Sequence, residues 1–219
     1  MPTLLLYKTL AKIGISQMIK PHLDILIGGA PRAGRSLLAA ALFDAFHIPV
    51  IHGDTLVNAM KNGYPGAFGI QFDALTPEDH AARMAPVQLF LKKAIRNMGK
   101  DISYRAKVFE SCYLHPQTVA TLAREGKVVS VFLIYGDFDI NTRLKEIRTY
   151  AADNQHCWSH GYDDVSLARS LQSQKQFSHF LRSECKQYGV DWVEIKNDWA
   201  TEWSRAQADL IAHVRGLIT

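Results

Sequence analysis

Short apolar runs recur at wide intervals along the chain, and longer stretches that mix apolar with polar residues separate them. The runs lie at 23–28, 48–52, 106–111, 128–135 and 190–195, and most of them are rich in β-branched residues. Runs of this length and composition are typical of strands that are buried on both faces. The pattern therefore predicts a sheet of about five strands.

Apolar residues return with a helical period between these runs. The clearest helix is predicted from Thr76 to Asn97: Thr76 is a good N-cap, Pro77 suits the first helical position, and Gly99 follows as a stop. Further helices are predicted at 117–124, 164–187 and 199–216. Strands that alternate with helices indicate parallel βαβ units, so we expect a three-layer α/β fold.

The length of 219 residues suits a single domain over residues 1–219. Residues 1–21 form an N-terminal extension in which 3–19 fit an amphipathic helix packed on the domain; a membrane-surface anchor is the alternative. Lys8 and Lys12 interrupt the apolar run of this extension, which predicts no membrane span and no signal peptide.

Composition and charge restrict the class of partner. Hydrophobic residues make up 47% of the chain and the formal net charge is +4, which fits a globular protein with a small anionic ligand. No basic stripe with interleaved aromatic residues is present, so no nucleic-acid partner is expected. The three cysteines are odd in number and widely spaced, which favours reduced thiols and a cytoplasmic location.

A glycine-rich stretch directly follows the first predicted strand and precedes a run of strong helix formers. It reads G-x-x-x-x-G-R-S, and with the next residue it comprises Gly29, Ala30, Pro31, Arg32, Ala33, Gly34, Arg35, Ser36 and Leu37. Strand, glycine loop and helix form the context in which backbone N–H groups and the positive end of a helix dipole bind phosphate. We therefore expect these residues to bind a nucleotide; an ordinary turn is the alternative.

The loop departs from the Walker A pattern at one position, where Arg35 stands in place of lysine. Arginine is planar and fork-shaped, and lysine is a compact point charge, so the two are not equivalent. Arg35 keeps phosphate binding plausible and puts fast phosphoryl transfer in question. Ser36, the next residue, offers a hydroxyl group to Mg²⁺.

Two acidic residues stand at the ends of predicted strands, where ligands of open parallel sheets bind. Asp54 follows the second strand and could accept the proton of an attacking hydroxyl group; an N-cap of a helix over 55–60 is the alternative. Glu110 ends the third strand and resembles the Walker B acid, which predicts a magnesium ligand. His52 and His115 lie near the same strand ends and fit structural roles better than metal ligation.

Arg143 and Arg148 follow the fourth predicted strand. Cationic groups at this place could close on a transferring phosphoryl group, so both are candidate catalytic residues. A solvated, charged helix surface is the alternative for each of them.

Taken together, these features resemble the P-loop kinases of the nucleoside-monophosphate-kinase type. That group includes adenylate, shikimate and gluconate kinases, chloramphenicol phosphotransferases and zeta toxins, and the chain looks closest to loosely characterised bacterial kinase-like proteins. The resemblance rests on 29–36, on 108–114 and on 132–137 with the arginines that follow. It implies a P-loop NTPase fold with five parallel strands, a helical cover over 55–100 on the acceptor side and a lid-like segment over 137–165.

The resemblance implies phosphoryl transfer from ATP, with Mg²⁺, to a small acceptor that the sequence does not identify. Asp54 would match the base, and Arg35, Arg143 and Arg148 would carry the cationic roles. Two alternatives stay open. One is nucleotide binding without turnover. The other is a sulfotransferase that uses phosphoadenosine phosphosulfate, because the Pro31-Arg32 pair is similar to the loop of those enzymes.

Overall fold

The structure is a computed structural model that describes residues 23–70, 83–98, 106–155, 157–196 and 199–218. One sheet lies at its centre. Its strands are β1 (Leu23–Gly29), β2 (Val50–His52), β3 (Ala106–Glu110), β4 (Val128–Ile134) and β5 (Trp192–Glu194). They pair in the order β2-β3-β1-β4-β5, and every pair is parallel. The five predicted strands are thus confirmed, although β2 and β5 are shorter than their apolar runs.

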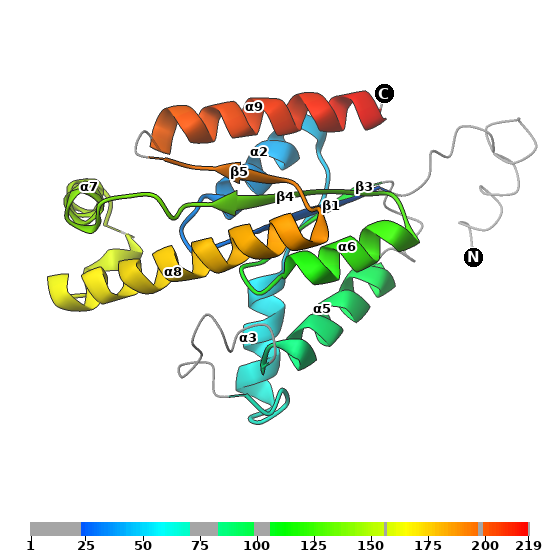
Figure 1. Ribbon diagram of the computed structural model, residues 1–219, viewed down its shortest axis with the longest axis horizontal. Coiled ribbons are helices and arrows are strands. Elements are labelled where there is room, and N and C mark those ends of the chain that lie inside the picture. The colour runs from blue at the N-terminus through cyan, green and yellow to red at the C-terminus, as the bar shows by residue number, and fades with distance from the viewer. Residues whose placement is uncertain (1–22, 71–82, 99–105, 156, 197–198, 219) are drawn as a thin grey trace, which may run out of the picture.

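Helices cover both faces of this sheet (Figure 1). They are α2 (Arg35–Phe46), α3 (Gly53–Gly63), α5 (Ala85–Met98), α6 (Pro116–Glu125), α7 (Ile140–Ala152), α8 (Asp164–Tyr188) and α9 (Trp199–Ile218), with the short 3₁₀ helix η3 (Trp158–Gly161). Helices α2 and α9 lie on one face, and α5, α6 and α8 lie on the other. This arrangement confirms the predicted three-layer α/β fold.

The two layers have separate cores because successive strand residues point to opposite faces. Ile25 and Ile27 of β1 pack with Leu38 of α2 in one core, whereas Leu26 packs with Phe109 in the other. All five side chains are buried. The continuous apolar runs of the sequence therefore reflect strands that are covered on both sides.

Two expectations about helix starts have different outcomes. Helix α3 begins at Gly53 with His52 at its N-cap, so the alternative that Asp54 caps a helix over 55–60 is wrong; Asp54 lies inside the first turn. The predicted start of the helix at Thr76 lies outside the described residues, as does the extension over 1–21. Helix α5 covers the second half of the helix that was predicted to end at Asn97.

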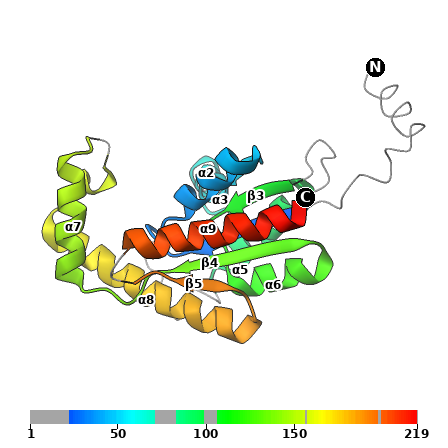
Figure 2. The ribbon, with the colours of Figure 1, turned by 90° about the horizontal axis from the view of Figure 1, so that it is seen from above.

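The segment that follows β4 projects beyond the carboxyl ends of the strands (Figure 2). Its helix α7 starts at an N-cap, Asp139, whose carboxylate accepts a hydrogen bond of 2.8 Å from the Thr142 amide. Helix α7 packs on α8 and on η3. The stretch that was predicted to be lid-like, 137–165, therefore contains α7 and η3 and stands next to the strand ends.

None of the described helices combines the length and the apolar character that crossing a membrane requires.

Candidate phosphate-binding site

The loop between β1 and α2 is a turn that uses left-handed backbone conformations. Gly29 has φ 134°, Arg32 has φ 64° and Gly34 has φ 100°. A Cβ atom at Gly29 would lie 2.4 Å from the carbonyl oxygen of Leu133, so no side chain fits there. Gly34, the N-cap residue of α2, has no side chain that could accept a hydrogen bond from the first turn. The first amide groups of α2 can therefore bind an anion.

The side chain of Arg35 turns inward, toward the carboxyl ends of β2 and β3. It is 7% exposed, and its Nε donates to the carbonyl oxygen of Ala30 over 3.4 Å. Its Nη1 lies 2.9 Å from Glu110 Oε2, and its Nη2 lies 3.3 Å from Asp54 Oδ2. One guanidinium group thus joins the loop to Asp54 and Glu110, the two candidate acidic residues. These bonds hold the guanidinium at the carboxyl ends of the strands.

Asp54 accepts hydrogen bonds on both carboxylate oxygens. Its Oδ1 receives the Ser111 hydroxyl over 2.7 Å and the Cys112 amide over 2.8 Å, and its Oδ2 faces Arg35. Burial by itself would raise the pKa of Asp54, but the charge of Arg35 and the hydrogen bonds from Ser111 and Cys112 outweigh burial and lower this pKa below its ordinary value. Asp54 is therefore ionised at neutral pH, and its side chain is 30% exposed.

Glu110 is almost fully buried and holds three donors around its carboxylate. Besides Arg35, Ser36 Oγ lies 3.3 Å and His52 Nδ1 lies 2.6 Å from its Oε1. Because Ser36 directs its hydrogen toward Glu110, the lone pairs of the serine oxygen point elsewhere and can bind a cation. His52 was expected to have a structural role, and its ring binds this carboxylate.

The hydroxyl of Ser36 and the carboxylate of Glu110 are the oxygen ligands that Mg²⁺ prefers, so this pair fits a magnesium ion. In the described part of the chain, no group of three or more His, Cys, Asp or Glu side chains is arranged to hold a metal. Phosphate oxygens and water would therefore have to supply most of the coordination, as is usual for magnesium in nucleotide sites.

A cavity of about 700 Å³ opens beside this network. One wall comes from the glycine loop, the start of α2 and the strand ends, and is formed by Pro31, Arg32, Gly34, Arg35, Ser36, Leu37, Asp54 and Cys112. The other wall comes from α7 and η3, and is formed by Arg143, Glu146, Ile147, Tyr150 and Trp158. The first wall carries two arginines and Asp54, and the second combines the Arg143–Glu146 pair with apolar and aromatic side chains.

The two arginines of α7 that were predicted to be catalytic lie in different surroundings. Arg143 lines the cavity, pairs with Glu146 over 2.9 Å and stacks its guanidinium 5.0 Å from the centre of the Tyr135 ring. Arg148 is not among the lining residues of this cavity. Arg143 therefore shares this cavity with the glycine loop, and Arg148 does not line it.

Arg148 instead connects α7 with the residues that precede α8. It donates to the carbonyl oxygens of Ser159 over 3.1 Å and of Tyr162 over 2.6 Å, and its Nε lies 2.9 Å from Asp164 Oδ1. These three bonds hold η3 against α7, and so they hold one wall of the cavity in position.

Two tryptophans contact the loop, and the sequence analysis did not include them. The guanidinium of Arg32 lies 4.1 Å from the centre of the Trp158 ring, and Trp203 Nε1 donates to the Gly34 carbonyl oxygen over 3.3 Å. Trp158 is distant from the loop in the sequence and belongs to no recognisable motif, so no local signal marks it. Cys112 was also missed as a lining residue; burial raises the pKa of its thiol to about 12, so it stays protonated.

No protein-family model matches this sequence, and no curated protein sequence is similar to it at a significant level. Solved structures with a related arrangement do exist. An uncharacterized protein from Eubacterium ventriosum is 17% identical, with a TM-score of 0.48 over 89% of this chain and 99% of its own. The shikimate kinase of Bacteroides thetaiotaomicron is 13% identical, with a TM-score of 0.42 over 90% of this chain and 98% of its own.

A gluconokinase from Sinorhizobium meliloti is 17% identical, with a TM-score of 0.43 over 90% of this chain and 97% of its own. At these identities and TM-scores the likeness carries no conclusion about the activity of this chain. The site rests on the geometry of the loop and the strand ends.

Proposed function

We propose that this chain transfers a phosphoryl group from ATP to a small acceptor that carries a hydroxyl group. One observation supports this proposal above the others: the glycine loop, Arg35, Ser36 and Asp54 line one cavity, and the buried carboxylate of Glu110 binds Arg35 and Ser36 beside it. Phosphoryl transfer depends mainly on positioning and electrostatics. It uses backbone amides and a cation to bind the phosphates, oxygen ligands to hold Mg²⁺, and a carboxylate base.

In this proposal the loop from Gly29 to Leu37, through its backbone N–H groups other than at Pro31, and the N-terminus of α2 bind the phosphates of the nucleotide. Arg32 and Arg35 add positive charge on one wall of the cavity, and Arg143 adds positive charge on the other. Arginine forms bidentate bonds with phosphate oxygens, which favours a fixed orientation of the distal phosphate. The predicted catalytic role of Arg148 becomes indirect, because it positions η3.

Asp54 is proposed as the base. An ionised carboxylate has about four lone-pair sites, and Asp54 uses two on Oδ1 and one on Oδ2. The fourth is free to accept the proton of the acceptor hydroxyl. In the reaction that proton moves to Asp54, a bond forms between the acceptor oxygen and the γ-phosphorus, and the bond to ADP breaks, with ADP as the leaving group.

Ser36 and Glu110 would hold Mg²⁺ beside the phosphates, with Ser36 as a direct ligand. When bound, the ion supplies positive charge that stabilises the negative charge of the phosphate oxygens. Glu110 orients the hydroxyl of Ser36 by accepting its hydrogen, so it acts through Ser36.

A second function, nucleotide binding without turnover, is favoured by one specific observation. Both Nη atoms of Arg35 are already engaged by carboxylates, and the guanidinium is buried. A phosphate must compete with Asp54 and Glu110 for this cation, whereas a Walker lysine is free to follow the transferred group. Affinity without product would be the result of that arrangement.

The test is calorimetric binding of ATP, ADP, AMP and phosphoadenosine phosphate, with and without Mg²⁺, together with ATP turnover. Arg35→Ala should weaken ATP binding by about 10–100-fold, which corresponds to a lost charged hydrogen bond or two, and should weaken AMP binding less. Arg205→Ala is the control, because Arg205 is exposed on α9 and pairs only locally with Glu202.

Asp54→Asn should retain ATP affinity and lose turnover by about 10²–10⁴-fold, the range for removal of a general base. Equal losses of ATP and AMP affinity in Arg35→Ala would place this side chain away from the transferred group. Magnesium-dependent affinity without any turnover in the parent would establish the binding function instead, and preference for phosphoadenosine phosphate would indicate a sulfotransferase.

A further inference from the structure

Arg32 and Arg35 line the same wall of the cavity, but their guanidinium groups are held differently. Arg35 is buried, and both of its Nη atoms face carboxylates, those of Asp54 and Glu110. Arg32 is exposed, and within the described part of the chain it forms no hydrogen bond and no ion pair. Arg32 therefore keeps its N–H donors for a ligand, whereas Arg35 has already committed its own.

The ring of Trp158 supports the guanidinium of Arg32 from one face. The Arg32 Cζ atom lies 4.1 Å from the centre of this ring, which is a cation–π contact. Such a contact uses the face of the guanidinium and leaves its edge, where the N–H bonds point, to other groups. Trp158 itself packs against the core beneath α2, and its ring meets Tyr162 edge-on at 5.8 Å between ring centres. The support is thus part of the folded wall.

The surroundings of Arg32 also favour an anion. Partial burial lowers the pKa of Arg32 below its ordinary value, and the charge of Arg35 acts in the same direction. Two like charges on one wall repel each other, and an anion that contacts both removes this repulsion. The backbone of Arg32 is left-handed, with φ 64°, a costly conformation for a residue with a Cβ atom that is often found where ligands bind.

We propose that Arg32, positioned by Trp158, does the work of the lysine in a Walker A loop and is the cation that follows the distal phosphates. Arg35, which stands at the lysine position, keeps its bonds to the carboxylates and contributes its charge from a fixed place. The inference rests on the proposed function, in that the glycine loop binds phosphate. Trp158 acts through Arg32, so it is a positioning residue.

Conformational entropy explains why a ring at this place matters. A free arginine side chain loses rotamer freedom when it binds phosphate, and this loss opposes binding. Trp158 has already restricted the side chain of Arg32, so less freedom is lost when the anion arrives. The contact also joins the phosphate to the outer wall of the cavity, because Trp158 begins η3 and Arg148 holds η3 against α7.

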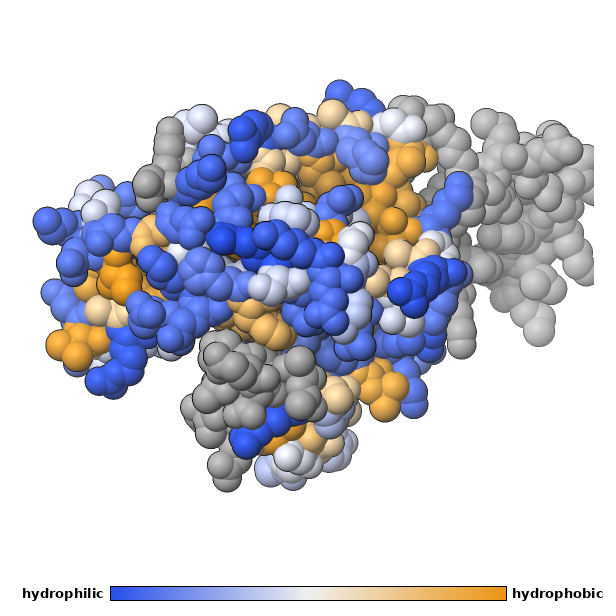
Figure 3. Space-filling model, viewed as in Figure 1, coloured by the Kyte–Doolittle hydropathy of each residue, from blue (hydrophilic) through white to orange (hydrophobic). Residues whose placement is uncertain are grey.

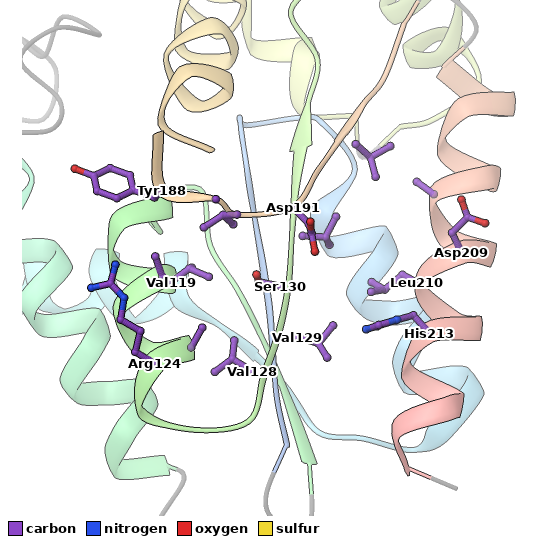
Figure 4. A pocket seen from close by; sticks show the side chains of 17 residues that line it. Val119, Arg124, Val128, Val129, Ser130, Tyr188, Asp191, Asp209, Leu210 and His213 are labelled. Atoms are coloured by element: carbon purple, nitrogen blue, oxygen red, sulfur yellow. The ribbon is translucent and has the colours of Figure 1, made fainter. Parts of the chain in front are cut away.

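A groove of about 450 Å³ between α6 and α9 offers a matched control, and Figure 4 shows Arg124 on its wall. Much of the surface between these two helices is apolar in the space-filling view (Figure 3). Arg124 is exposed and, like Arg32, has no hydrogen bond or ion pair with any described residue. It belongs to α6 and does not line the cavity at the glycine loop. Its removal changes the net charge as the removal of Arg32 does, without altering the loop.

The test is calorimetric binding of inorganic pyrophosphate to the full-length chain, because pyrophosphate offers phosphates without a nucleobase. Arg32→Ala should weaken this binding by about 10–100-fold, the range for lost hydrogen bonds to a charged group, and Arg124→Ala should change it by less than about twofold. Trp158→Leu should weaken it by about 3–10-fold, because Arg32 then loses its rotamer freedom only on binding. Trp158→Phe keeps an aromatic face and should restore most of the affinity.

A double variant separates positioning from a structural role of Trp158. In the Arg32→Ala background, Trp158→Leu should change the pyrophosphate affinity by less than about twofold, because Trp158 acts through Arg32. An equal loss in both backgrounds would overturn the proposal, since the ring would then support the wall and not the cation. Tighter binding in Trp158→Leu would also overturn it, because the ring would then compete with phosphate for Arg32.

Failure of this inference and failure of the proposed function give different results. Pyrophosphate affinity that Arg32→Ala leaves unchanged would overturn the inference, even if the parent turns over ATP. Affinity that depends on Arg32 and Trp158 in a chain without turnover would support the inference and leave nucleotide binding as the function. A parent that binds no pyrophosphate would overturn both.

Discussion

The carboxylate of Asp54 is ionised because its neighbours overcome the cost of burial. Burial raises its pKa, but Arg35, the Ser111 hydroxyl and the Cys112 amide together lower it below the ordinary value. A group whose pKa is lowered on folding adds stability above the pKa of the unfolded chain, about 3.9, and that stability is lost as the pH falls through the folded pKa.

Asp54→Asn should therefore destabilise the chain most at neutral pH. The difference in unfolding free energy between parent and variant should shrink as the pH is lowered below about 4, because the parent then has to protonate the same group. Urea titrations at a series of pH values measure this difference. Asp44→Asn, on the exposed surface of α2, is the matched control for an Asp-to-Asn substitution outside the site. A constant difference for Asp54→Asn would show that Arg35 does not stabilise the ionised form.

At the scale of elements, the outer wall of the cavity depends on how α7 and η3 are held together. Arg148 makes three bonds to the stretch from Ser159 to Asp164, and Arg143 makes one exposed ion pair within its own helix. Exposed pairs of this kind contribute little to stability, whereas bonds that close a loop restrict its local opening.

Arg148→Ala should make residues 153–163 about tenfold more sensitive to limited proteolysis, because the loss of one or two charged hydrogen bonds lowers the free energy of local opening by that factor. Arg143→Ala should leave the proteolysis rate unchanged and reduce ATP turnover. The two arginines of one helix thus serve as controls for each other. If both variants are cleaved at the parent rate, the bonds of Arg148 do not hold η3 in solution.

Across the whole molecule, the sheet is shared by two cores, so we expect them to unfold together. Phe132 and Leu133 are adjacent in β4 and both fully buried, but they point into different layers. Phe132→Ala should lower the free energy of unfolding by about 3–5 kcal/mol and Leu133→Ala by about 2–5 kcal/mol.

Each of these variants should still give a single transition in far-ultraviolet circular dichroism and in tertiary probes, because loss of either layer exposes the same strands. Two separate transitions in either variant would show that one layer survives the loss of the other.

The sequence was sufficient for the sheet and for the glycine loop, since both are local patterns. An apolar run shows a buried strand by itself, and Gly29 to Ser36 are consecutive residues that join β1 to α2. The lengths of β2 and β5 were not predictable, because pairing depends on where the chain approaches its neighbour: Val190 and Asp191 belong to an apolar run but lie outside β5.

Long-range contacts account for most of what was missed at the site. The sequence placed Asp54 and Glu110 at strand ends, but it did not show that Arg35 would join them or that His52 would bind Glu110. Trp158 stands far from Arg32 in the chain, and its position on the loop follows from how η3 packs. Contacts of this kind depend on tertiary packing and leave no periodic signal.

The contact between Trp203 and the glycine loop gives the protein an optical property. The indole donates its N–H to the carbonyl oxygen of Gly34, and a second indole, Trp158, lies under the guanidinium of Arg32. Two of the four tryptophans therefore touch the residues that would surround a phosphate. Intrinsic fluorescence is sensitive to charge and hydrogen bonding around the indole, so the unlabelled chain carries its own reporter of events at this loop.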